Sequence, residues 1–413
     1  MIVPKLRFSE FKDEWIESKI GENFNVTSGT TPLRSEQSYF ANPSIYWVKT
    51  TDLNNGIIKS TEEKISEIAL AKTSLKILPK NTVFVAMYGG FNQIGRTGLL
   101  SVEATCNQAL SAIYPNENFN PYFVLTYLNH KVDDWKNFAA SSRKDPNITK
   151  NDVLSFPIIY PNLEEQTKIA EFLSAVDDKI SQLSRQLELL NQYKKGVMQK
   201  IFSQEIRFKN DNGEDFGVWK TKFIKDLRLY ISDGNYGELY PTSSQFVKQG
   251  IAFIRANNIK HLKIVDDDMR FIDRELHKIL TSGHLKEDDI LVTTRGDIGT
   301  LAIVENNYVG ANINAQICLL RVIDTNQIYA RYLLYFLASS FGQKQFKELE
   351  TGTALKQLPK KNLDKILVNL PCIEEQKKIA EFLTAIDERI DHTTAQLPYT
   401  KQWKKGLLQQ MFV

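Results

Sequence analysis

The sequence predicts a mixed α/β protein in which two globular domains are separated by two long helices, as an internal repeat with a pseudo-twofold axis. The main observation is that residues 164–180 and 374–390 are identical at 12 of 17 positions, at an offset of 210. Both segments carry apolar residues at alternating steps of three and four, which is typical of long helices that pack together. Each is preceded by a segment long enough to bury a hydrophobic core of its own.

The composition is that of an ordinary folded protein in water. Of the 413 residues, 42% are hydrophobic and 24% are charged, and the net charge is +3. No run of ~18 or more apolar residues offers a membrane span, and the first residues lack the basic-then-apolar order of a signal peptide, so we expect a cytoplasmic location. Cys106, Cys318 and Cys372 are isolated and the five histidines are scattered, so we expect no metal site.

The repeat extends beyond these helical segments and indicates where the domains begin. At the same offset, residues 193–202 match residues 403–412 without a gap. Upstream the similarity is weaker but keeps its order. The matched segments are 6–15 with 206–219, 46–53 with 252–259, 122–138 with 330–346, and 148–153 with 358–363. We therefore expect globular domains over 1–160 and 206–370, and helical segments over 161–205 and 371–413.

A glycine-rich segment in the first domain is close to a phosphate-binding loop, with its glycines and Thr97 in place but Arg96 where the lysine belongs. Such a loop must open a helix, and the residues after Thr97 do not read as a helix start. The counterpart in the second domain, residues 292–304, lacks the four-residue spacer and any lysine. We therefore predict a glycine turn between two strands in each domain, with Arg96 or Arg295 beside it as a candidate contact surface.

The two long helices are predicted to pack on each other, antiparallel, as a coiled coil. A helix over residues 164–202 would be about 58 Å long at about 1.5 Å per residue, which exceeds the core of a small domain. Lys194 and Lys404 interrupt the apolar stripes. The seam residues are Ile169, Leu173, Val176, Ile180, Leu183 and Leu187 in the first helix, and Ile379, Leu383, Ile386, Ile390 and Leu397 in the second.

Two residue types weaken these helices locally. Pro398 lacks a backbone N–H and its ring opposes the carbonyl four residues back, so we expect a kink near residues 394–398. Gly196 and Gly406 occupy equivalent positions in the two copies. They are compatible either with a close crossing of the helices or with fraying near a helix end.

The whole chain resembles the specificity subunits of Type I restriction-modification systems. The resemblance rests on the opening residues 4–11, on two variable domains, and on two EEQ-x-KIAEFL helices that continue into YKKG or WKKG and an apolar end. It implies that each globular domain is a target recognition domain that reads one half of a split site in double-stranded DNA. It also implies that the helices set the gap between the halves and dock two methyltransferase subunits, and that motor-nuclease subunits complete the complex.

The resemblance further implies a chain without catalytic residues or cofactors of its own. S-adenosylmethionine, ATP and Mg²⁺ would be held by the partner subunits. Neutralising phosphates supplies most of the non-specific affinity for DNA, so a chain with a net charge of +3 should bind DNA weakly alone. We expect its partner subunits to supply much of the contact with DNA. The candidates for docking the methyltransferase are the acids at the helix starts: Glu164, Glu165, Glu374 and Glu375.

The residues that contact bases do not follow from the resemblance, because the recognition domains are the variable part of this family. Polar residues in loops shared by both halves are the candidates, since arginine pairs naturally with guanine, and asparagine or glutamine with adenine. In the first half they are Thr30, Arg34, Lys49, Thr50, Asn92, Gln93, Arg96, Arg143 and Lys144. In the second half they are Asn235, Tyr236, Arg255, Asn257, Asn258, Arg295, Asp297 and Lys356.

Two other classes of function are the alternatives. A DNA methyltransferase needs a glycine-rich methyl-donor loop and a proline-proline-aromatic tetrapeptide, and residues 42–46 have one proline and the wrong spacing. A nuclease needs clustered carboxylates with a lysine on a strand, whereas residues 266–268 read more simply as an exposed acidic turn. A coiled-coil scaffold explains the helices but not two copies of a loop-rich domain. A DNA gel shift with and without a methyltransferase subunit would separate reader, enzyme and scaffold.

Overall fold

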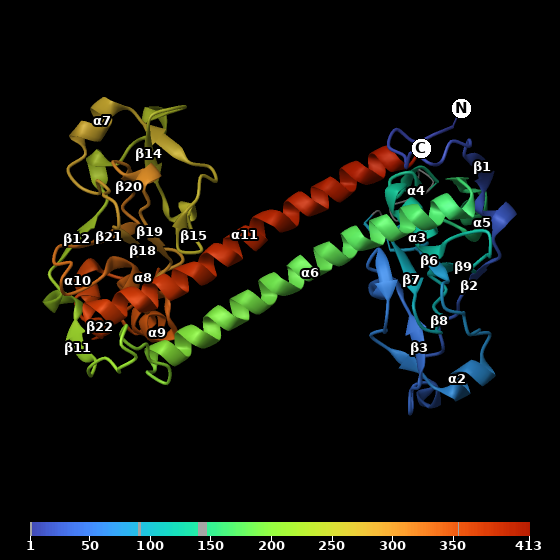
Figure 1. The fold of residues 1–413 in the computed structure, drawn as a ribbon, viewed down its shortest axis with the longest axis horizontal. Coiled ribbons are helices and arrows are strands. Elements are labelled where there is room, and N and C mark those ends of the chain that lie inside the picture. Colours follow the sequence, from blue (N-terminus) through green and yellow to red (C-terminus); the bar gives the residue numbers. More distant parts are fainter. Residues whose placement is uncertain (1, 90–91, 139–146, 354) are drawn as a thin grey trace. The chain divides into compact units, whose positions relative to one another are not determined.

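The computed structural model describes residues 2–89, 92–138, 147–353 and 355–413, and the chain divides into two compact units (Figure 1). Unit 1 comprises Met1–Ser184 and Ala395–Val413, and unit 2 comprises Arg185–Thr394. The division falls within the two long helices, α6 (Leu163–Phe202) and α11 (Ile373–Met411). Each unit therefore contains the start of one long helix and the end of the other.

Unit 1 is built on three small sheets, with strand orders β2-β9-β6-β7-β4, β5-β3-β8 and β1-β10. Its strands are β1 (Ile16–Lys19), β2 (Val26–Ser28), β3 (Ile45–Val48), β4 (Gly56–Ile58), β5 (Lys64–Ile65), β6 (Val83–Ala86), β7 (Thr97–Leu100), β8 (Thr105–Cys106), β9 (Leu110–Ile113) and β10 (Pro157–Tyr160). Its shorter helices are α1 (Ile20–Asn23), α2 (Glu67–Lys72), α3 (Pro121–His130), α4 (Trp135–Phe138) and α5 (Lys150–Ser155).

Unit 2 has two four-stranded sheets, β12-β21-β18-β19 and β13-β17-β14-β20, and two strand pairs, β11-β22 and β15-β16. The strands are β11 (Lys220–Phe223), β12 (Leu229–Asp233), β13 (Phe246–Val247), β14 (Ile251–Ile254), β15 (Ile259–Lys260), β16 (Lys263–Ile264), β17 (Arg270–Ile272), β18 (Ile290–Thr293), β19 (Leu301–Ile303), β20 (Asn312–Ile313), β21 (Ile317–Val322) and β22 (Leu367–Leu370). The shorter helices are α7 (Arg274–Ile279), α8 (Ala330–Ala338), α9 (Ser340–Glu348) and α10 (Lys360–Leu363).

The internal repeat predicted from the sequence is confirmed by the elements that recur in order. The second strand of an antiparallel pair, β10 of β1-β10 or β22 of β11-β22, immediately precedes each long helix. A buried hairpin, β6-β7 or β18-β19, is followed by an apolar helix, α3 or α8. The predicted fold class, a mixed α/β protein with two related globular parts and two long helices, is therefore confirmed.

Each unit buries the end of one long helix in its core. In unit 1, the ring of Phe412 packs edge-on or tilted against Trp15, Phe123 and Tyr127. In unit 2, Phe202 takes the same place, because its ring contacts Tyr332 and Phe336 at centroid distances of 5.9 and 5.6 Å. The final apolar residues of the two helices are thus core residues of the globular units.

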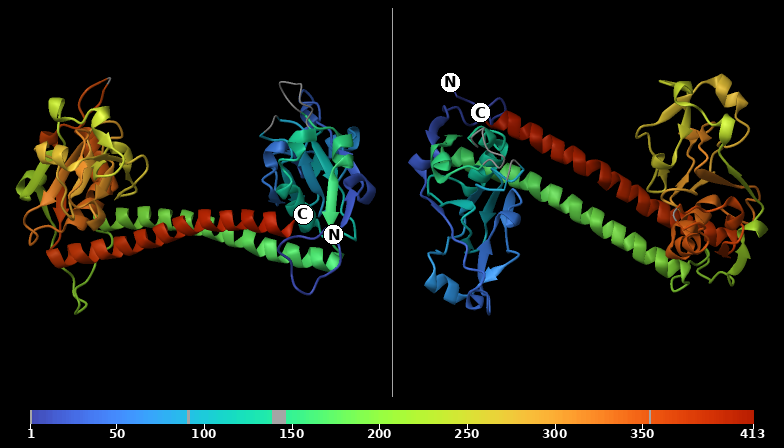
Figure 2. Two further views of the ribbon diagram at one scale, coloured as in Figure 1. Left: turned by 90° about the horizontal axis from the view of Figure 1, so that it is seen from above. Right: turned by 180° about the vertical axis from the view of Figure 1, so that it is seen from behind.

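Within each unit the two long helices are antiparallel, as predicted (Figures 1 and 2). In unit 1, Asp177 near the start of α6 forms an ion pair of 2.6 Å with Lys404 near the end of α11. In unit 2, Lys194 near the end of α6 forms an ion pair of 2.5 Å with Asp387 near the start of α11. The two lysines that interrupt the apolar stripes therefore hold the opposite helix in each unit.

The seam is only partly a helix-helix contact. Ile169, Leu173 and Val176 share one buried cluster with Leu407 of α11, and this cluster also contains the side chains of α3. Seam residues toward the helix middles are half-buried: Ile180, Leu187, Ile390 and Leu397.

Helix α11 is continuous through Pro398, and the predicted kink stays a prediction. In the described part of the chain, none of the helices is long and apolar enough to cross a membrane.

Candidate nucleic-acid interface

The predicted glycine turn between two strands is confirmed in both units. The strands β6 and β7 are antiparallel partners, as are β18 and β19. Gly95 and Gly299 have φ angles of 76° and 83°, and an added Cβ would lie 2.5 Å from Trp135 or 2.9 Å from Phe346. Only glycine fits there. Because a strand and not a helix follows the first turn, that segment lacks the helix start that a phosphate-binding loop requires.

Two cations of unit 1 that were predicted to contact DNA are already paired with acids. The guanidinium of Arg34 lies 2.7 Å from the carboxylate of Glu63, and its plane lies over the ring of Phe40. The ammonium of Lys49 lies 2.9 Å from Glu63 and 3.1 Å from Glu62. The hydrogen bond from Lys49, supported by Arg34, lowers the pKa of Glu63. This cluster brings Arg34 and Lys49 together, but its own acids compensate their charge.

The other described candidates of unit 1 lie in three segments, after β2, after β3 and in the β6-β7 turn. Thr30 shares a hydrogen bond of 2.7 Å with Ser74, and Thr50 begins a short 3-10 turn after β3. At the β6-β7 turn, Asn92 is exposed, and Arg96 donates to the side-chain oxygen of Gln93 at 2.8 Å. Two further predicted contacts lie outside the described residues: Arg143 and Lys144.

In unit 2 the structure gathers four predicted residues around one open pocket of about 460 Å³. Each lining segment follows the end of a strand: β12, β14, β18 or β20. The predicted residues that line it are Tyr236, Arg255, Asn257 and Arg295. Tyr240, Asn314 and Gln316 also line it and were missed. Asn314 and Gln316 come just after β20, so a strand predicted there is the signal that could have identified them.

Two predicted contacts of unit 2 are wrong, because their side chains are buried and fully used inside the domain. The amide of Asn235 is 3% exposed, donates to the carbonyl of Ser282 at 2.9 Å and accepts from the backbone N–H of Thr281. Asn258 is 0% exposed and accepts from the backbone N–H of Arg255 at 3.1 Å. Both asparagines hold loop backbones in place, and neither can reach a base.

The last two candidates of unit 2 lie near the pocket without lining it. Asp297 is an exposed residue of the β18-β19 turn, and its backbone carbonyl accepts a hydrogen bond of 2.9 Å from the hydroxyl of Thr300. Lys356 is exposed and forms an ion pair of 3.0 Å with Glu350. The charge of Lys356 is thereby compensated within the chain.

Two of the four acids predicted to dock a partner are wrong for that role, because they are buried ion-pair members. Glu165 is 0% exposed and receives hydrogen bonds of 2.7 Å from Nε and Nη2 of Arg7. Glu375 is 0% exposed and receives the same fork from Arg207, at 2.7 and 2.8 Å. These hydrogen bonds raise the pKa of each arginine. Their exposed neighbours keep the predicted role: Glu164 and Glu374.

A tryptophan completes each of these buried clusters. The indole Nε1 of Trp219 donates to Glu375 at 3.0 Å, and that of Trp15 lies 3.4 Å from an oxygen of Glu165. The sequence carries the signal in both halves, since an arginine and then a tryptophan recur in residues 6–15 and 206–219. Each cluster ties the start of a long helix to the segment that begins its globular domain.

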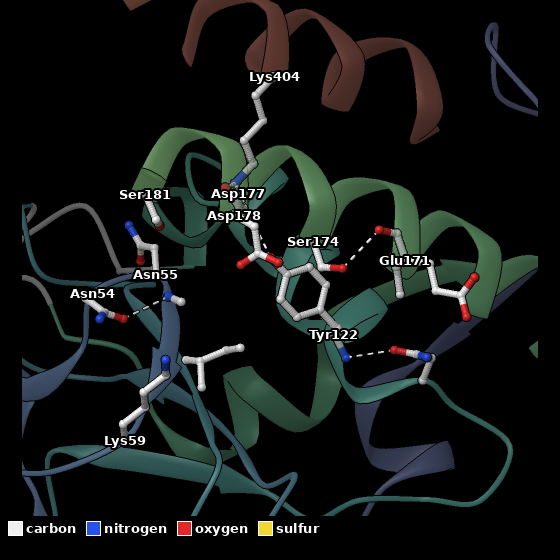
Figure 3. A pocket seen from close by; sticks show the side chains of 14 residues that line it. Asn54, Asn55, Lys59, Tyr122, Glu171, Ser174, Asp177, Asp178, Ser181 and Lys404 are labelled. Atoms are coloured by element: carbon white, nitrogen blue, oxygen red, sulfur yellow. Dashed lines mark hydrogen bonds and ion pairs between the residues drawn. The ribbon is translucent and has the colours of Figure 1, made fainter. Parts of the chain in front are cut away.

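An acidic groove in unit 1 lies where α6 passes the globular part (Figure 3). Its volume is about 790 Å³, and Glu171, Asp177 and Asp178 line it together with Lys59 and Lys404. The hydroxyl of Tyr122 donates to Asp177 at 2.6 Å. Burial, followed by this hydrogen bond, raises the pKa of Tyr122, which keeps its proton as the donor. The acids of this groove outnumber its lysines, which disfavours contact with a phosphate backbone there.

Unit 2 has an equivalent groove of about 350 Å³ beside α11. Asp387, Glu388 and Asp391 line it, and the hydroxyl of Tyr335 donates to Asp387 at 2.8 Å. In both units a tyrosine hydroxyl and a lysine of the opposite long helix meet one aspartate. The aspartate is Asp177 beside Lys404 in unit 1, and Asp387 beside Lys194 in unit 2. The nucleic-acid candidates lie elsewhere, at the hairpin turns and strand ends.

The long helices also expose apolar side chains at equivalent positions. Tyr399 and Trp403 of unit 1 are 73% and 46% exposed, and Leu189 and Tyr193 of unit 2 are 46% and 54% exposed. The first pair lies 210 residues after the second, which is the repeat offset. Exposed apolar patches are typical of surfaces that bind proteins, membranes or ligands.

Metal coordination has no support in the described residues, where no three histidine, cysteine, aspartate or glutamate side chains come together as ligands. Cys106 and Cys318 are buried, and burial raises the pKa of the Cys106 thiol to about 12. That thiol is therefore neutral and behaves as a small apolar side chain.

The comparison with protein families gives one match, which occurs twice along the chain. The family is described as the Type I restriction modification DNA specificity domain, and it matches residues 12–192 and 218–399. One match falls in each half of the internal repeat.

Individual relatives agree with this match. The Type I restriction enzyme MjaVIII specificity subunit of Methanocaldococcus jannaschii is 26% identical over 96% of this chain and 91% of its own length. The EcoR124I/EcoR124II specificity subunit of Escherichia coli is 27% identical over 45% of this chain and 46% of its own length. A Type I specificity subunit structure from M. genitalium covers 100% of this chain and 99% of its own, with a TM-score of 0.63 at 16% identity.

Proposed function

Because this chain belongs to the family of Type I restriction-modification DNA specificity proteins, we propose that it reads a two-part target in double-stranded DNA, one part with each unit. The observation that carries the proposal is the double match to the specificity domain, supported by two units that repeat the same elements. The side chains at their strand ends differ, since unit 1 has a compensated cluster around Glu63 and unit 2 has an open polar pocket. A shared scaffold with different loops suits two different half-sites.

The chain is a targeting subunit and not itself the enzyme. In this proposal, methyl transfer to adenine and ATP-dependent cleavage belong to methyltransferase and motor-nuclease subunits. Those partners hold S-adenosylmethionine, ATP and Mg²⁺. The specificity subunit gives them their position on DNA, and the small net charge of +3 leaves part of the phosphate contact to them.

The expected result in cells is adenine methylation at one two-part sequence with a constant gap. The chain is expressed with a methyltransferase subunit of its own system in a host without other adenine methylation, and the methylated sites are read by sequencing. The methyltransferase alone is the control and should leave the DNA unmethylated. Methylation without this chain, or at one continuous sequence, contradicts the proposal.

We propose that two methyltransferase subunits dock on the long helices, and the repeated apolar surface supports this proposal. Each unit presents one such pair, Tyr399 with Trp403 or Leu189 with Tyr193. Two equivalent surfaces suit two copies of the same partner, whereas a single asymmetric partner would need only one. The exposed acids at the helix starts, Glu164 and Glu374, remain further candidates for contact with the partner on each unit.

Replacing Tyr399 and Trp403 by serine is expected to remove one of two methyltransferase copies, because aromatic side chains dominate the binding energy of such interfaces. Adding Leu189→Ser and Tyr193→Ser should remove the second copy. The mass of the complex measures both losses. Gln402→Ser, a change at an exposed polar position of the same helix, is the matched control. A complex that keeps two copies in the fourfold variant would contradict this surface.

A further inference from the structure

The open pocket of unit 2 has the side chains to read one base pair of a half-site. We infer that Arg295 reads a guanine in the major groove there, an assignment that rests on the proposed function. Arg295 lies two residues after the end of β18, next to Gly296 in the β18-β19 turn, and it lines the pocket with Tyr236 and Arg255. The lining segments come from the ends of β12, β14, β18 and β20, so they face one opening.

The first step of the inference is that the charge of Arg295 is available. Among the side chains that the structure describes, Arg295 has no acidic partner and no side-chain hydrogen bond, and it is exposed. Other cations predicted to contact DNA differ in this respect. Arg255 lies 2.8 Å from Asp268, and Lys356 lies 3.0 Å from Glu350. Recognition by Arg295 therefore requires no internal ion pair to break.

The second step is that Arg295 is held in place before DNA arrives. Its guanidinium lies over the ring of Tyr236, 5.6 Å from the centroid. The hydroxyl of Tyr236 in turn donates to the carboxylate of Asp233 at 3.3 Å, which fixes the ring. A guanidinium stacked on a ring keeps its two parallel N–H donors free, and that fork matches N7 and O6 of guanine.

The third step is the polarity of the neighbouring side chains. Asn257 is exposed, and within the described residues its side-chain amide takes part in no hydrogen bond. Gln316 accepts from Asn314 at 3.1 Å through its side-chain oxygen, so its NH₂ group remains available. Amides beside an arginine suit the edges of adjacent bases. Cations alone would be enough for a site that contacts only phosphate, so the amides favour contact with bases.

The experiment compares methylated motifs of the complete modification complex with Arg295, with Arg295→Ala and with Arg295→Lys. We expect a single half of the motif to change, at one G·C pair, with the other half and the gap unaltered. The preference for that pair should fall by on the order of 10- to 100-fold in the alanine variant. Lysine should not restore it, because an ammonium lacks the planar fork. Arg274→Ala, at an exposed arginine of α7 outside the pocket, is the control and should leave the motif intact.

Four results would overturn the inference. They are an unchanged motif in Arg295→Ala, an affected half-site without a G·C pair at the altered position, a change in both halves, and equal weakening at every site that lysine rescues. The last result would make Arg295 a phosphate contact. A wild-type complex without any two-part motif would instead overturn the proposed function, and this inference with it.

Discussion

Replacing Arg207 by methionine is expected to lower the free energy of unfolding of unit 2 by about 3 to 5 kcal/mol. The carboxylate of Glu375 is 0% exposed, and both of its oxygens are held by Arg207, at 2.7 and 2.8 Å. Without the arginine, a charged group stays buried with the indole N–H of Trp219 as its remaining donor. Urea unfolding followed by tryptophan fluorescence measures the loss, in a background where the other four tryptophans, all in unit 1, are replaced by phenylalanine so that Trp219 alone reports.

The matched control is Glu374→Lys, which changes the neighbouring acid. Glu374 is exposed at the start of α11, so we expect a smaller loss there, of the size of an interaction with the helix dipole, about 0.3 to 1 kcal/mol. Equal losses in the two variants would mean that burial of Glu375 does not matter. Arg7→Met and Glu164→Lys provide the same comparison in unit 1.

Lengthening both long helices by four residues is expected to widen the gap in the DNA target by one or two base pairs. Four residues add about 6 Å at about 1.5 Å per residue, against a rise of about 3.4 Å per base pair. The insertions belong at equivalent positions, between Leu187 and Tyr193 in α6 and between Leu397 and Trp403 in α11. Sequencing of methylated sites measures the gap, and both half-sites should stay the same.

The reciprocal ion pairs explain why both helices must change together. Asp177 pairs with Lys404, and Lys194 with Asp387. In the sequence the two residues on each helix are 17 apart, 194 minus 177 and 404 minus 387. Inserting four residues into α6 alone would make these two spacings unequal. We then expect the complex with the methyltransferase not to assemble. Inserting two residues into each helix would rotate the apolar stripe by about 200° and should also abolish assembly. An unaltered gap in the paired four-residue variant contradicts a spacer role.

The elements that the sequence predicted well are those fixed by local pattern. The long helices follow from apolar periodicity, and the hairpin turns follow from glycines such as Gly95 and Gly299. The family follows from the repeated helix motif, and the comparisons confirm it. Each of these features can be recognised from a short segment of the sequence or by aligning one half of the chain with the other.

The roles of single polar residues could not be predicted in the same way. Asn235 and Asn258 resemble any loop asparagine in the sequence, and their burial depends on loops that pack over them. Glu165 and Glu375 look like ordinary exposed acids at helix starts, and only the fold brings Arg7 and Arg207 to them. The availability of Arg295 likewise depends on which acids lie nearby in space.

The order in which the chain is synthesised has a consequence for unit 1. Unit 2 is one continuous stretch, whereas the core of unit 1 needs Phe412 against Trp15 and Phe123, and the N–H of Leu6 donates to the carbonyl of Gln410 at 2.8 Å. At about 5 to 20 residues per second, a ribosome needs on the order of 20 to 80 s to connect them. During that time the apolar surface around Trp15 is open to chaperones and proteases. The half that is synthesised first is therefore finished last.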